Sequence, residues 1–219
     1  MKLVKNLYKL FRPSDASYHL VFPFIPFIFS DTLSFSMLAI VIILFSVSMC
    51  GFGLNNMFDV DTDSKNYKMR NKNPFVSKEI KRNQSFVIFS FFLFVSIIVS
   101  FFLFGEITFY LILAISFGAL YSVPPFRFKR RFIFDMIFHG LGTVFFMLYS
   151  FFIISLNSNY LLPATIACFL ISTLFNLGNE IDDYESDKKA NLKTTVVTLG
   201  KRTSFLVYFV LFVILYLFF

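Results

Sequence analysis

Seven stretches of this sequence are almost entirely apolar, and short polar segments separate them. A helix that crosses a bilayer needs about 20 such residues, and somewhat fewer when it is irregular or buried in protein. Of the 219 residues 57% are hydrophobic and 36 are Phe, which is more apolar material than a soluble domain of this size can bury. The sequence therefore predicts an all-α, polytopic membrane protein. The expected spans are 18–29, 34–54, 86–104, 108–123, 133–156, 161–178 and 204–219.

The first expected span is the weakest of the seven. It is short and contains Pro23 and Pro26. Extending it back towards Pro13 gives an adequate length with kinks, which neighbouring helices can tolerate in a membrane. No small-residue cleavage site follows the basic N-terminal segment, so we expect this span to be retained rather than removed as a signal peptide.

The positive charges provide an independent indication of topology, because Lys and Arg accumulate in cytoplasmic loops. With the N-terminus inside, the inside segments hold four positive residues before the first span, seven within 65–82, four within 127–131 and five within 188–202. These are all 20 Lys and Arg residues of the chain. We expect a multi-pass cell-membrane protein whose N-terminus is cytoplasmic. The net charge of +7 then reflects orientation, and no nucleic-acid partner is expected.

Two polar segments repeat one pattern. Asn55, Asp59 and Asp63 stand four residues apart, and Asn179, Asp183 and Asp187 repeat that spacing 124 positions later (179 minus 55). On a helix such residues lie on one face. Both sets follow an even-numbered span, so both lie at the inside face and can face each other across one cavity mouth. Solvated helix ends are the alternative, but two matching copies on the same side make it the weaker interpretation.

The positions around each triplet refine this prediction. Asn56 and Glu180 precede the central Asp of each set by three residues, so we expect the two faces to match there as well. The helical period excludes three other acidic residues from direct contact with a ligand: Asp61, Asp182 and Glu185.

The donor atoms in the two sets are all oxygens, which favours Mg²⁺ over Zn²⁺. Mg²⁺ in proteins typically takes a few carboxylates together with phosphate oxygens of a substrate. The pattern therefore predicts a diphosphate bound between two acidic walls, with a hydrocarbon chain in the apolar groove behind it.

Basic residues near the motifs fit an anionic ligand. They include Arg70 after the first motif, Lys188 after the second, and Arg127 and Lys129 after the segment Tyr121-Ser122-Val123-Pro124-Pro125. The prolines stop the helix, which would place Tyr121 at the cavity rim and the two cations over its mouth. For any single Lys the cytoplasmic charge bias explains the residue equally well, and the Pro-Pro segment could simply be a helix terminator. Arg12 is either an anchor or a cation that faces the cavity.

The remaining reactive side chains are expected to be structural. His19 and His139 lie in or beside apolar spans, where a lone His is most often a hydrogen-bonded packing residue. Cys50 and Cys168 lie within apolar spans and are too few for a disulfide framework or a metal cluster.

These motifs resemble the UbiA superfamily of intramembrane prenyltransferases. The resemblance rests on the segments 55–63 and 179–187, on the Tyr-Ser-x-Pro-Pro stretch at Tyr121 and on Arg12-Pro13, and it runs from residue 12 to about residue 202. It implies a helical bundle around a central cavity, in which Mg²⁺ links an isoprenyl diphosphate to the acidic motifs and a prenyl group is transferred to a lipophilic acceptor from the membrane. The implied catalytic residues are Asp59, Asp63, Asp183 and Asp187, which with Asn55 would hold the metal; Asn55, Asn179, Arg12, Arg70, Tyr121 and Lys129 would bind substrate.

The sequence departs from the family pattern in three places. Asn56 stands where Asp is frequent, and Asn73-Pro74 stands where Arg-Pro is frequent. The family usually has nine spans, so we expect residues 1–219 to form one C-terminally shortened domain. Three functions stay open at this point: an active prenyltransferase, an impaired member that binds isoprenoid diphosphate or acts with a partner subunit or as a homo-oligomer, and, least favoured, a divalent-cation transporter.

Overall fold

The computed structural model describes residues 2–29, 35–67 and 69–218, and within these ranges the protein is built from helices without a strand. One isolated bridge pairs Arg131 with Lys193. The prediction of an all-α bundle is confirmed. The longer helices are α1 (Lys2–Phe11), α4 (Phe35–Phe58), α6 (Arg82–Phe104), α7 (Thr108–Ser122), α8 (Phe134–Ile153), α9 (Leu161–Lys189) and α11 (Lys201–Phe218). The short elements are α2 (Pro13–Tyr18), α3 (Val21–Phe24), η1 (Ile25–Phe29), α5 (Val60–Asp63), η2 (Gly105–Ile107), η3 (Phe128–Arg130), η4 (Ser158–Tyr160) and α10 (Thr195–Leu199).

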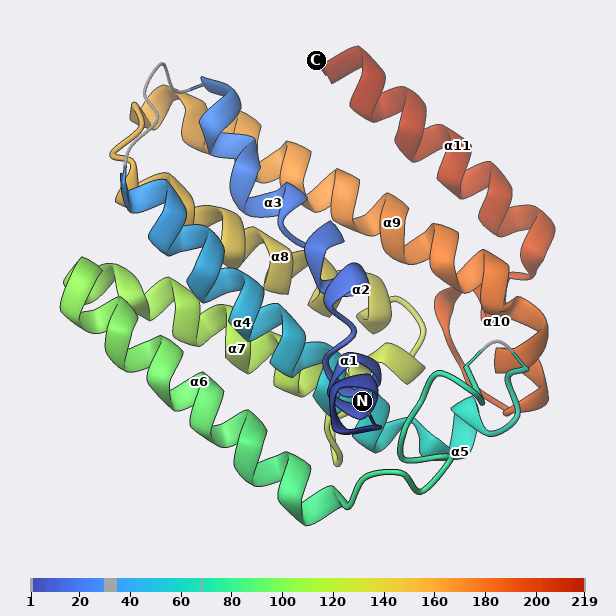
Figure 1. The fold of residues 1–219 in the computed structure, drawn as a ribbon. Coiled ribbons are helices and arrows are strands. Elements are labelled where there is room, and N and C mark those ends of the chain that lie inside the picture. Colours follow the sequence, from blue (N-terminus) through green and yellow to red (C-terminus); the bar gives the residue numbers. More distant parts are fainter. Residues whose placement is uncertain (1, 30–34, 68, 219) are drawn as a thin grey trace.

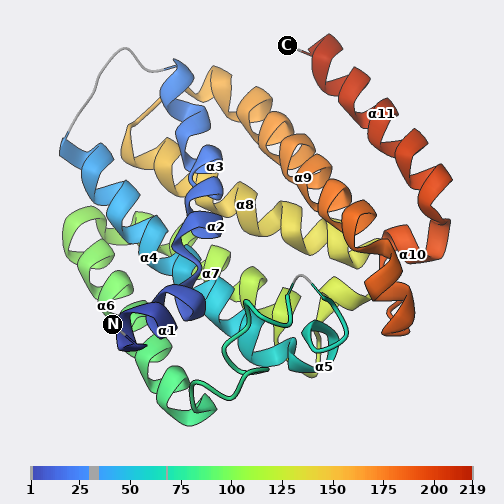
Figure 2. The same cartoon turned by 45° about the vertical axis from the view of Figure 1, so that its right-hand side comes forward.

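The long helices α4, α6, α7, α8, α9 and α11 lie side by side with their axes in broadly the same direction (Figures 1 and 2). Helix α8 lies centrally and packs against both α7 and α9, and α11 lies outermost against α9. The N-terminal helices α2 and α3 cross over the bundle beside α4 and α8. The short helices α5 and α10 and the long connection 64–81 gather at one end, together with α1.

Five stretches of the described residues are long and apolar enough to cross a membrane, and the stretch Arg82–Ser122 contains both α6 and α7. A turn at Gly105, which has a positive φ of 57°, folds these two helices back on each other. The expected bounds of most spans agree with the helices to within a few residues. The sixth differs, because α9 continues for 11 residues past the expected end at Gly178 and carries the second acidic motif in the same helix.

The first expected span is interrupted. Residues 18–29 do not form one helix but contribute to α2, α3 and η1, with α2 beginning at Pro13. Pro23 and Pro26 each lack an N–H and cannot continue the hydrogen bonds of a helix, which explains the breaks. The expected extension back to Pro13 and the expected kinks both agree with these helices. Residues 30–34, where the next span was expected to begin, lie outside the described residues.

Helix α6 shows how polar groups are accommodated in the apolar bundle. Its Ser100 is fully buried and shares hydrogen bonds of 2.8 Å with Thr108 and with Tyr149 of α8. Its opposite face carries exposed aromatic residues, and Phe102 is 81% exposed. Hydroxyl pairs can join helices inside a membrane while apolar side chains face lipid. Both the hydrogen bonds and the Phe-rich surface thus fit a helix embedded in a bilayer.

Candidate active site

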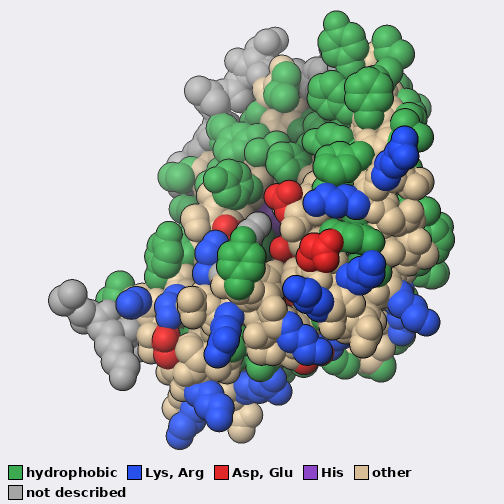
Figure 3. All heavy atoms as spheres, turned by 90° about the vertical axis from the view of Figure 1, so that its right-hand side faces the viewer, with side chains coloured by type: hydrophobic (Ala, Val, Ile, Leu, Met, Phe, Trp, Pro, Cys, Tyr) green, Lys and Arg blue, Asp and Glu red, His purple; other side chains and the backbone are tan. Residues whose placement is uncertain are grey.

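A cavity of about 730 Å³ opens at the end of the bundle where the short helices gather. Its lining includes all six residues of the repeated pattern: Asn55, Asp59, Asp63, Asn179, Asp183 and Asp187. Figure 3 shows acidic side chains around a hollow in this face, with many Lys and Arg side chains beside and below it. The prediction that the two motifs face one cavity mouth agrees with this geometry.

The first motif lies across a break between two helices. Helix α4 ends at Phe58, and Asp59 has non-helical angles (φ −99°, ψ 9°) before α5 begins at Val60. The i to i−4 hydrogen bonds continue through the break, with Asp59 N to Asn55 O at 2.9 Å and Asp63 N to Asp59 O at 2.7 Å. This explains why the spacing of four still brings all three side chains to the cavity although the helix is not continuous.

Three cations surround Asp59. Lys129 Nζ donates to Asp59 Oδ2, and Arg127 Nη2 lies 3.2 Å from Oδ1. Arg130 contacts the same carboxylate at 3.7 Å and binds Asp61 through two hydrogen bonds of 2.9 Å. The Lys129 side chain is only 11% exposed, and its burial lowers the pKa of the ammonium group, against the attraction of Asp59. Lys129 lines the cavity mouth, as predicted. Arg127 does not line the cavity, where Arg130 lies instead, and its guanidinium binds the backbone oxygen of Phe58 and the carboxylate of Asp59.

The segment after α7 also positions neutral groups of the site. Ser122 donates to Asn55 Oδ1, and Lys129 Nζ approaches the same oxygen at 3.5 Å. Tyr121 donates its hydroxyl proton to Asn176 Oδ1 at 3.0 Å, while Asn176 donates to Glu180 at 2.9 Å. Tyr121 therefore lies at the cavity wall, as predicted, but its hydroxyl is already bonded to α9.

Asp63 is held by the long connection that follows it. Asn73, which is fully buried, donates from Nδ2 to Asp63 Oδ2 at 2.7 Å and also bonds the backbone oxygen of Asn56. Burial raises the pKa of the Asp63 carboxyl to about 6, with a further upward contribution from Asp59 and an opposing one from the Asn73 hydrogen bond. Asn73 thus positions a carboxylate at a place where the family pattern suggested a phosphate-binding Arg.

The second motif lies on one unbroken helix. Asn179, Asp183 and Asp187 all belong to α9, which runs to Lys189. Asn66, from the connection after the first motif, donates to Asp183 Oδ1 at 3.2 Å and lies 3.3 Å from Ser186 Oγ. Among the described residues no Lys or Arg forms an ion pair with this motif. Asp182, which the helical period excluded, also lines the cavity, whereas Asp61 and Glu185 do not.

Asn56 and Glu180 do not play matching roles, contrary to the sequence prediction. Asn56 is buried away from the cavity and donates to the backbone oxygens of Lys9 and Leu10, so it holds α1 against α4. Glu180 lines the cavity and accepts from Asn176 and from the backbone N–H of Val196 at the start of α10. The break at Asp59 and the different neighbours of the two helices explain the mismatch.

The arrangement fits Mg²⁺ only together with a ligand that adds oxygen donors. In the ranges that the structure describes, no group of three or more His, Cys, Asp or Glu side chains is placed to hold a metal ion. The donors that line the mouth are carboxylate and amide oxygens, which suit a hard cation. Two walls of such donors, facing each other without converging, are what a metal shared with substrate phosphates requires.

The other predicted substrate contacts divide into two groups. Arg12 lines the cavity, where its guanidinium lies 5.1 Å from the centre of the Phe52 ring and donates to Asp15. Arg70 is exposed and is not among the lining residues, so its predicted contact with diphosphate gains no support. Sequence reasoning missed Asn66 and Asn73 as holders of the carboxylates. The only feature of the sequence that could have indicated this role is the frequency of Asn in the basic loop after the first motif.

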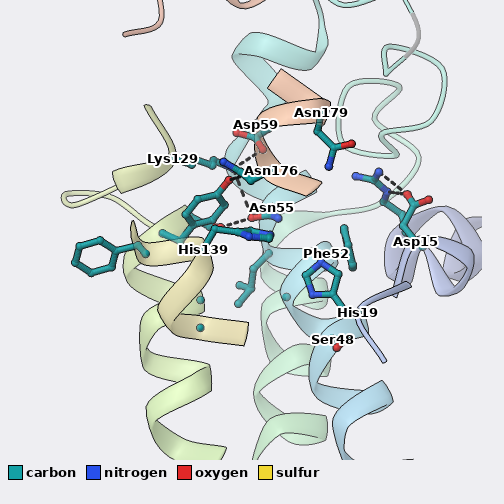
Figure 4. Close-up of a pocket in the computed structure, with 18 of the residues that line it drawn as sticks. Asp15, His19, Ser48, Phe52, Asn55, Asp59, Lys129, His139, Asn176 and Asn179 are labelled. Carbon is teal, nitrogen blue, oxygen red and sulfur yellow. Dashed lines mark hydrogen bonds and ion pairs between the residues drawn. The ribbon is translucent and has the colours of Figure 1, made fainter. Parts of the chain in front are cut away.

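Both histidines line the cavity (Figure 4), which sequence reasoning did not anticipate. His139 has a hydrogen bond of 2.8 Å between Nδ1 and Ser172 Oγ, as expected for a packing His, but its ring also lies 5.8 Å from that of His19. Cys50 and Cys168 are free and buried, in agreement with a packing role.

The deeper lining of the cavity is apolar and aromatic. Much of it comes from α4, α7 and α8, and it includes Phe22, Val47, Leu93, Ile115, Phe146 and Phe175. Such a lining is suited to binding a hydrocarbon chain and disfavours water in this part of the cavity.

Comparisons with known proteins identify the fold. Among solved structures, a UbiA homologue from Archaeoglobus fulgidus bound to DMAPP and Mg²⁺ superposes with a TM-score of 0.83 at 22% identity, covering 97% of this chain and 76% of that one. The same homologue bound to GPP and Mg²⁺ gives 0.82 at 23% identity with the same coverage. A further structure, from work on the biosynthesis of digeranylgeranylglyceryl phosphate synthase in membranes, gives a TM-score of 0.74 at 20% identity. The match covers 100% of this chain and 76% of that one.

A search of curated proteins finds no match. The model of the UbiA prenyltransferase family, in contrast, matches residues 22–219, which is nearly the whole chain. Together with the five apolar stretches, this match makes the protein an integral membrane protein. The chain belongs to the UbiA prenyltransferase family.

Proposed function

We propose that this protein catalyses Mg²⁺-dependent transfer of a prenyl group from an isoprenyl diphosphate to a lipophilic acceptor within the membrane. The observation that carries the proposal is the opposition of two acidic motifs across one cavity whose mouth is cationic and whose depth is apolar. Structures of the UbiA homologue from Archaeoglobus fulgidus support it, because that protein binds DMAPP or GPP together with Mg²⁺.

The diphosphate is expected at the mouth, between the two motifs. Asn55, Asp59 and Asp63 on one side and Asp183 and Asp187 on the other would hold Mg²⁺, which when bound neutralises the charge of the leaving group. Arg130 lines the mouth, and its Nε is buried without a hydrogen-bond partner among the described residues. A phosphate oxygen would satisfy such a donor, and charge-assisted bonds of this kind are the stronger ones.

Lys129 has a second expected role. In the structure its ammonium group neutralises Asp59, and it also lies within 3.5 Å of Asn55 Oδ1. A divalent cation at Asp59 would take over this neutralisation, so Lys129 would then turn to the diphosphate. Lys129 would thereby neutralise Asp59 before Mg²⁺ binds and assist the departure of the leaving group afterwards.

The apolar depth of the cavity serves the chemical step. When the allylic C–O bond breaks, the electron pair leaves with diphosphate and the prenyl carbon becomes electron-deficient. Water would capture this carbon, so the wall of Phe and aliphatic side chains protects it until the acceptor reacts. Tyr121 and Phe52 offer π faces near the mouth, which stabilise positive charge.

The decisive experiment is a transfer assay with protein in lipid nanodiscs. The assay combines labelled geranylgeranyl diphosphate and MgCl₂ with a panel of lipid, quinone-precursor and carotenoid acceptors. We expect transfer by the wild type and its loss in Asp59→Ala and Asp183→Ala. Glu185→Ala is the matched control, because Glu185 lies on the same helix as Asp183 and does not line the cavity.

The outcomes separate the open functions. Diphosphate binding without transfer to any acceptor would indicate an impaired member or one that needs a partner subunit. Mg²⁺ flux across liposomes, without either binding or transfer, would indicate a transporter and contradict the proposal. Orientation is tested in the same liposomes by labelling a Cys placed at Lys72, which we propose to be cytoplasmic, against one placed at Asn159.

A further inference from the structure

We propose that His139 is the general base for the acceptor, and that His19, Phe52 and Tyr121 complete an acceptor subsite for a lipid that carries a free hydroxyl group. The inference rests on the proposed prenyl transfer and specifies how its second substrate is recognised. It starts from an unexpected finding: the two histidines of the chain, 120 positions apart (139 minus 19), meet in one cavity.

The subsite is formed by residues from four elements. His139 comes from α8, His19 from the end of α2, Phe52 from α4 and Tyr121 from α7. The ring centres lie 5.8 Å apart for His139 and His19, 5.6 Å for His139 and Tyr121, and 5.0 Å for His19 and Phe52. Figure 4 shows both His rings directed into the space beside Asn55, with Asp59 and Lys129 beyond it. The cluster therefore lies next to the expected diphosphate position and on the apolar side of it.

Ser172 gives His139 an orientation that His19 lacks. The Ser172 hydroxyl is fully buried on α9 and lies 2.8 Å from His139 Nδ1. We assign the Nδ1–H tautomer, in which Nδ1 donates to Ser172 Oγ and Nε2 keeps its lone pair. Among the described residues no group forms a hydrogen bond with Nε2, so this atom is available to accept a proton from a ligand in the cavity.

A hydroxyl acceptor uses this lone pair better than the alternatives. An O–H group can donate to Nε2 before the reaction, which turns a lone pair of its oxygen towards the prenyl carbon. An alkene or an aromatic ring carbon has no such donor. The apolar lining around the cluster, including Phe22, Val47 and Phe175, would accept the hydrocarbon part of the lipid.

The allylic C–O bond to diphosphate breaks and its electron pair leaves with diphosphate. The acceptor oxygen forms a new C–O bond with the prenyl carbon, and its proton passes to His139 Nε2. The imidazolium formed then releases the proton to water at the cavity mouth, which returns the base to its starting form.

The test compares His139→Gln with His19→Gln in nanodiscs. The donor is geranylgeranyl diphosphate and the probe acceptor is a monoprenylated glyceryl phosphate with one free hydroxyl. Gln keeps a hydrogen-bonding side chain of similar size but is not a base. We expect His139→Gln to lower kcat for transfer by about 100-fold or more, as for loss of a general base. His19→Gln should instead mainly raise the acceptor KM.

Two control readouts exclude a merely structural effect. Binding of a non-hydrolysable geranylgeranyl thiodiphosphate with Mg²⁺ should stay within about threefold of wild type in His139→Gln. Ser172→Ala should lower kcat by up to about tenfold, because it frees the ring.

Three results would overturn the inference. They are an unchanged kcat in His139→Gln, an equal loss in His19→Gln, and prenylation of 4-hydroxybenzoate at a ring carbon in preference to the alcohol. Equal transfer to the probe acceptor by the wild type and by His139→Gln would contradict this inference alone. A wild type that neither transfers nor solvolyses the donor removes the proposed function as well.

Discussion

The two acidic motifs have the same spacing but different surroundings. The first crosses a helix break, and its central Asp59 contacts Lys129, Arg127 and Arg130. The second lies on the continuous helix α9, and the contact recorded for its central Asp183 is a neutral amide donor, Asn66. One wall of the cavity is therefore neutralised by the protein itself, whereas the other is not.

This difference indicates that the two acidic motifs have different roles in binding Mg²⁺. An unneutralised pair of carboxylates attracts a cation most strongly, so the second motif is the expected first point of capture for Mg²⁺. If Mg²⁺ binds as proposed, the first motif would exchange Lys129 for the metal, and this exchange would release the Lys129 ammonium group close to the diphosphate. Identical spacing thus serves two different electrostatic tasks.

The largest expected effect comes from neutralising the central Asp on either side. Asp59→Asn and Asp183→Asn should each lower transfer by at least about 100-fold, because both remove a proposed metal ligand. Their stabilities should differ. Asp59→Asn leaves the buried Lys129 without its ion-pair partner among the described residues, whereas Arg127 and Arg130 keep Asp61, and it should lower the free energy of unfolding by about 2 kcal/mol. Asp183→Asn keeps the acceptor for Asn66 and should leave stability unchanged.

Thermal unfolding in detergent without Mg²⁺ checks this pair. Asp61→Asn is a useful control, since Asp61 pairs with the same arginines but its side chain is 60% exposed. Equal melting temperatures for Asp59→Asn and Asp183→Asn would contradict the asymmetry of charge.

A smaller effect is expected at the positions that precede each central Asp by three residues. In Asn56→Asp a carboxylate would face the backbone oxygens of Lys9 and Leu10, so the protein should lose about 2 kcal/mol and α1 should detach. Glu180→Gln keeps an oxygen for Val196 N–H but loses the one that accepts from Asn176, so it should cost only about 1 kcal/mol. Limited proteolysis near residue 12 measures the detachment. Similar proteolysis in both variants would contradict the different roles.

The sequence predicted the parts of this architecture that depend on local pattern. Apolar length located the helices, and the spacing of four placed Asp59 and Asp183 on one cavity. The sequence prediction failed where contacts between distant segments determine the structure. The break at Asp59, the burial of Asn56 against α1 and the approach of Asn66 and Asn73 all depend on how segments far apart pack. The pairing of His19 with His139 was hidden for the same reason, because each His alone resembles a packing residue.

The pH dependence of Mg²⁺ binding should distinguish the walls further. Burial raises the pKa of the Asp63 carboxyl to about 6, so below that pH protons compete with the metal for this ligand. The Mg²⁺ concentration needed for half-maximal transfer should rise by about tenfold per pH unit below pH 6. Asn73→Ala removes a hydrogen bond to the charged form, so the transition should move to higher pH. Titrations between pH 5 and 8 check this. An unchanged transition in Asn73→Ala would contradict the assignment to Asp63.

The smallest expected effect concerns Asn66, the direct link between the loop of the first motif and the second motif. Its amide donates to the Asp183 carboxylate at 3.2 Å and to Ser186 at 3.3 Å, and a long hydrogen bond from a neutral donor at such a partly buried site contributes about 1 kcal/mol. Asn66→Ala should therefore raise the Mg²⁺ requirement only about three- to fivefold, leaving kcat at saturating Mg²⁺ nearly unchanged. Asn71→Ala is the control, because Asn71 is an exposed residue of the same connection. A loss as large as that of Asp183→Asn would mean that the loop, rather than α9, sets the position of the second wall. The two motifs would then differ in how firmly their positions are fixed, and not in whether the protein neutralises their charge.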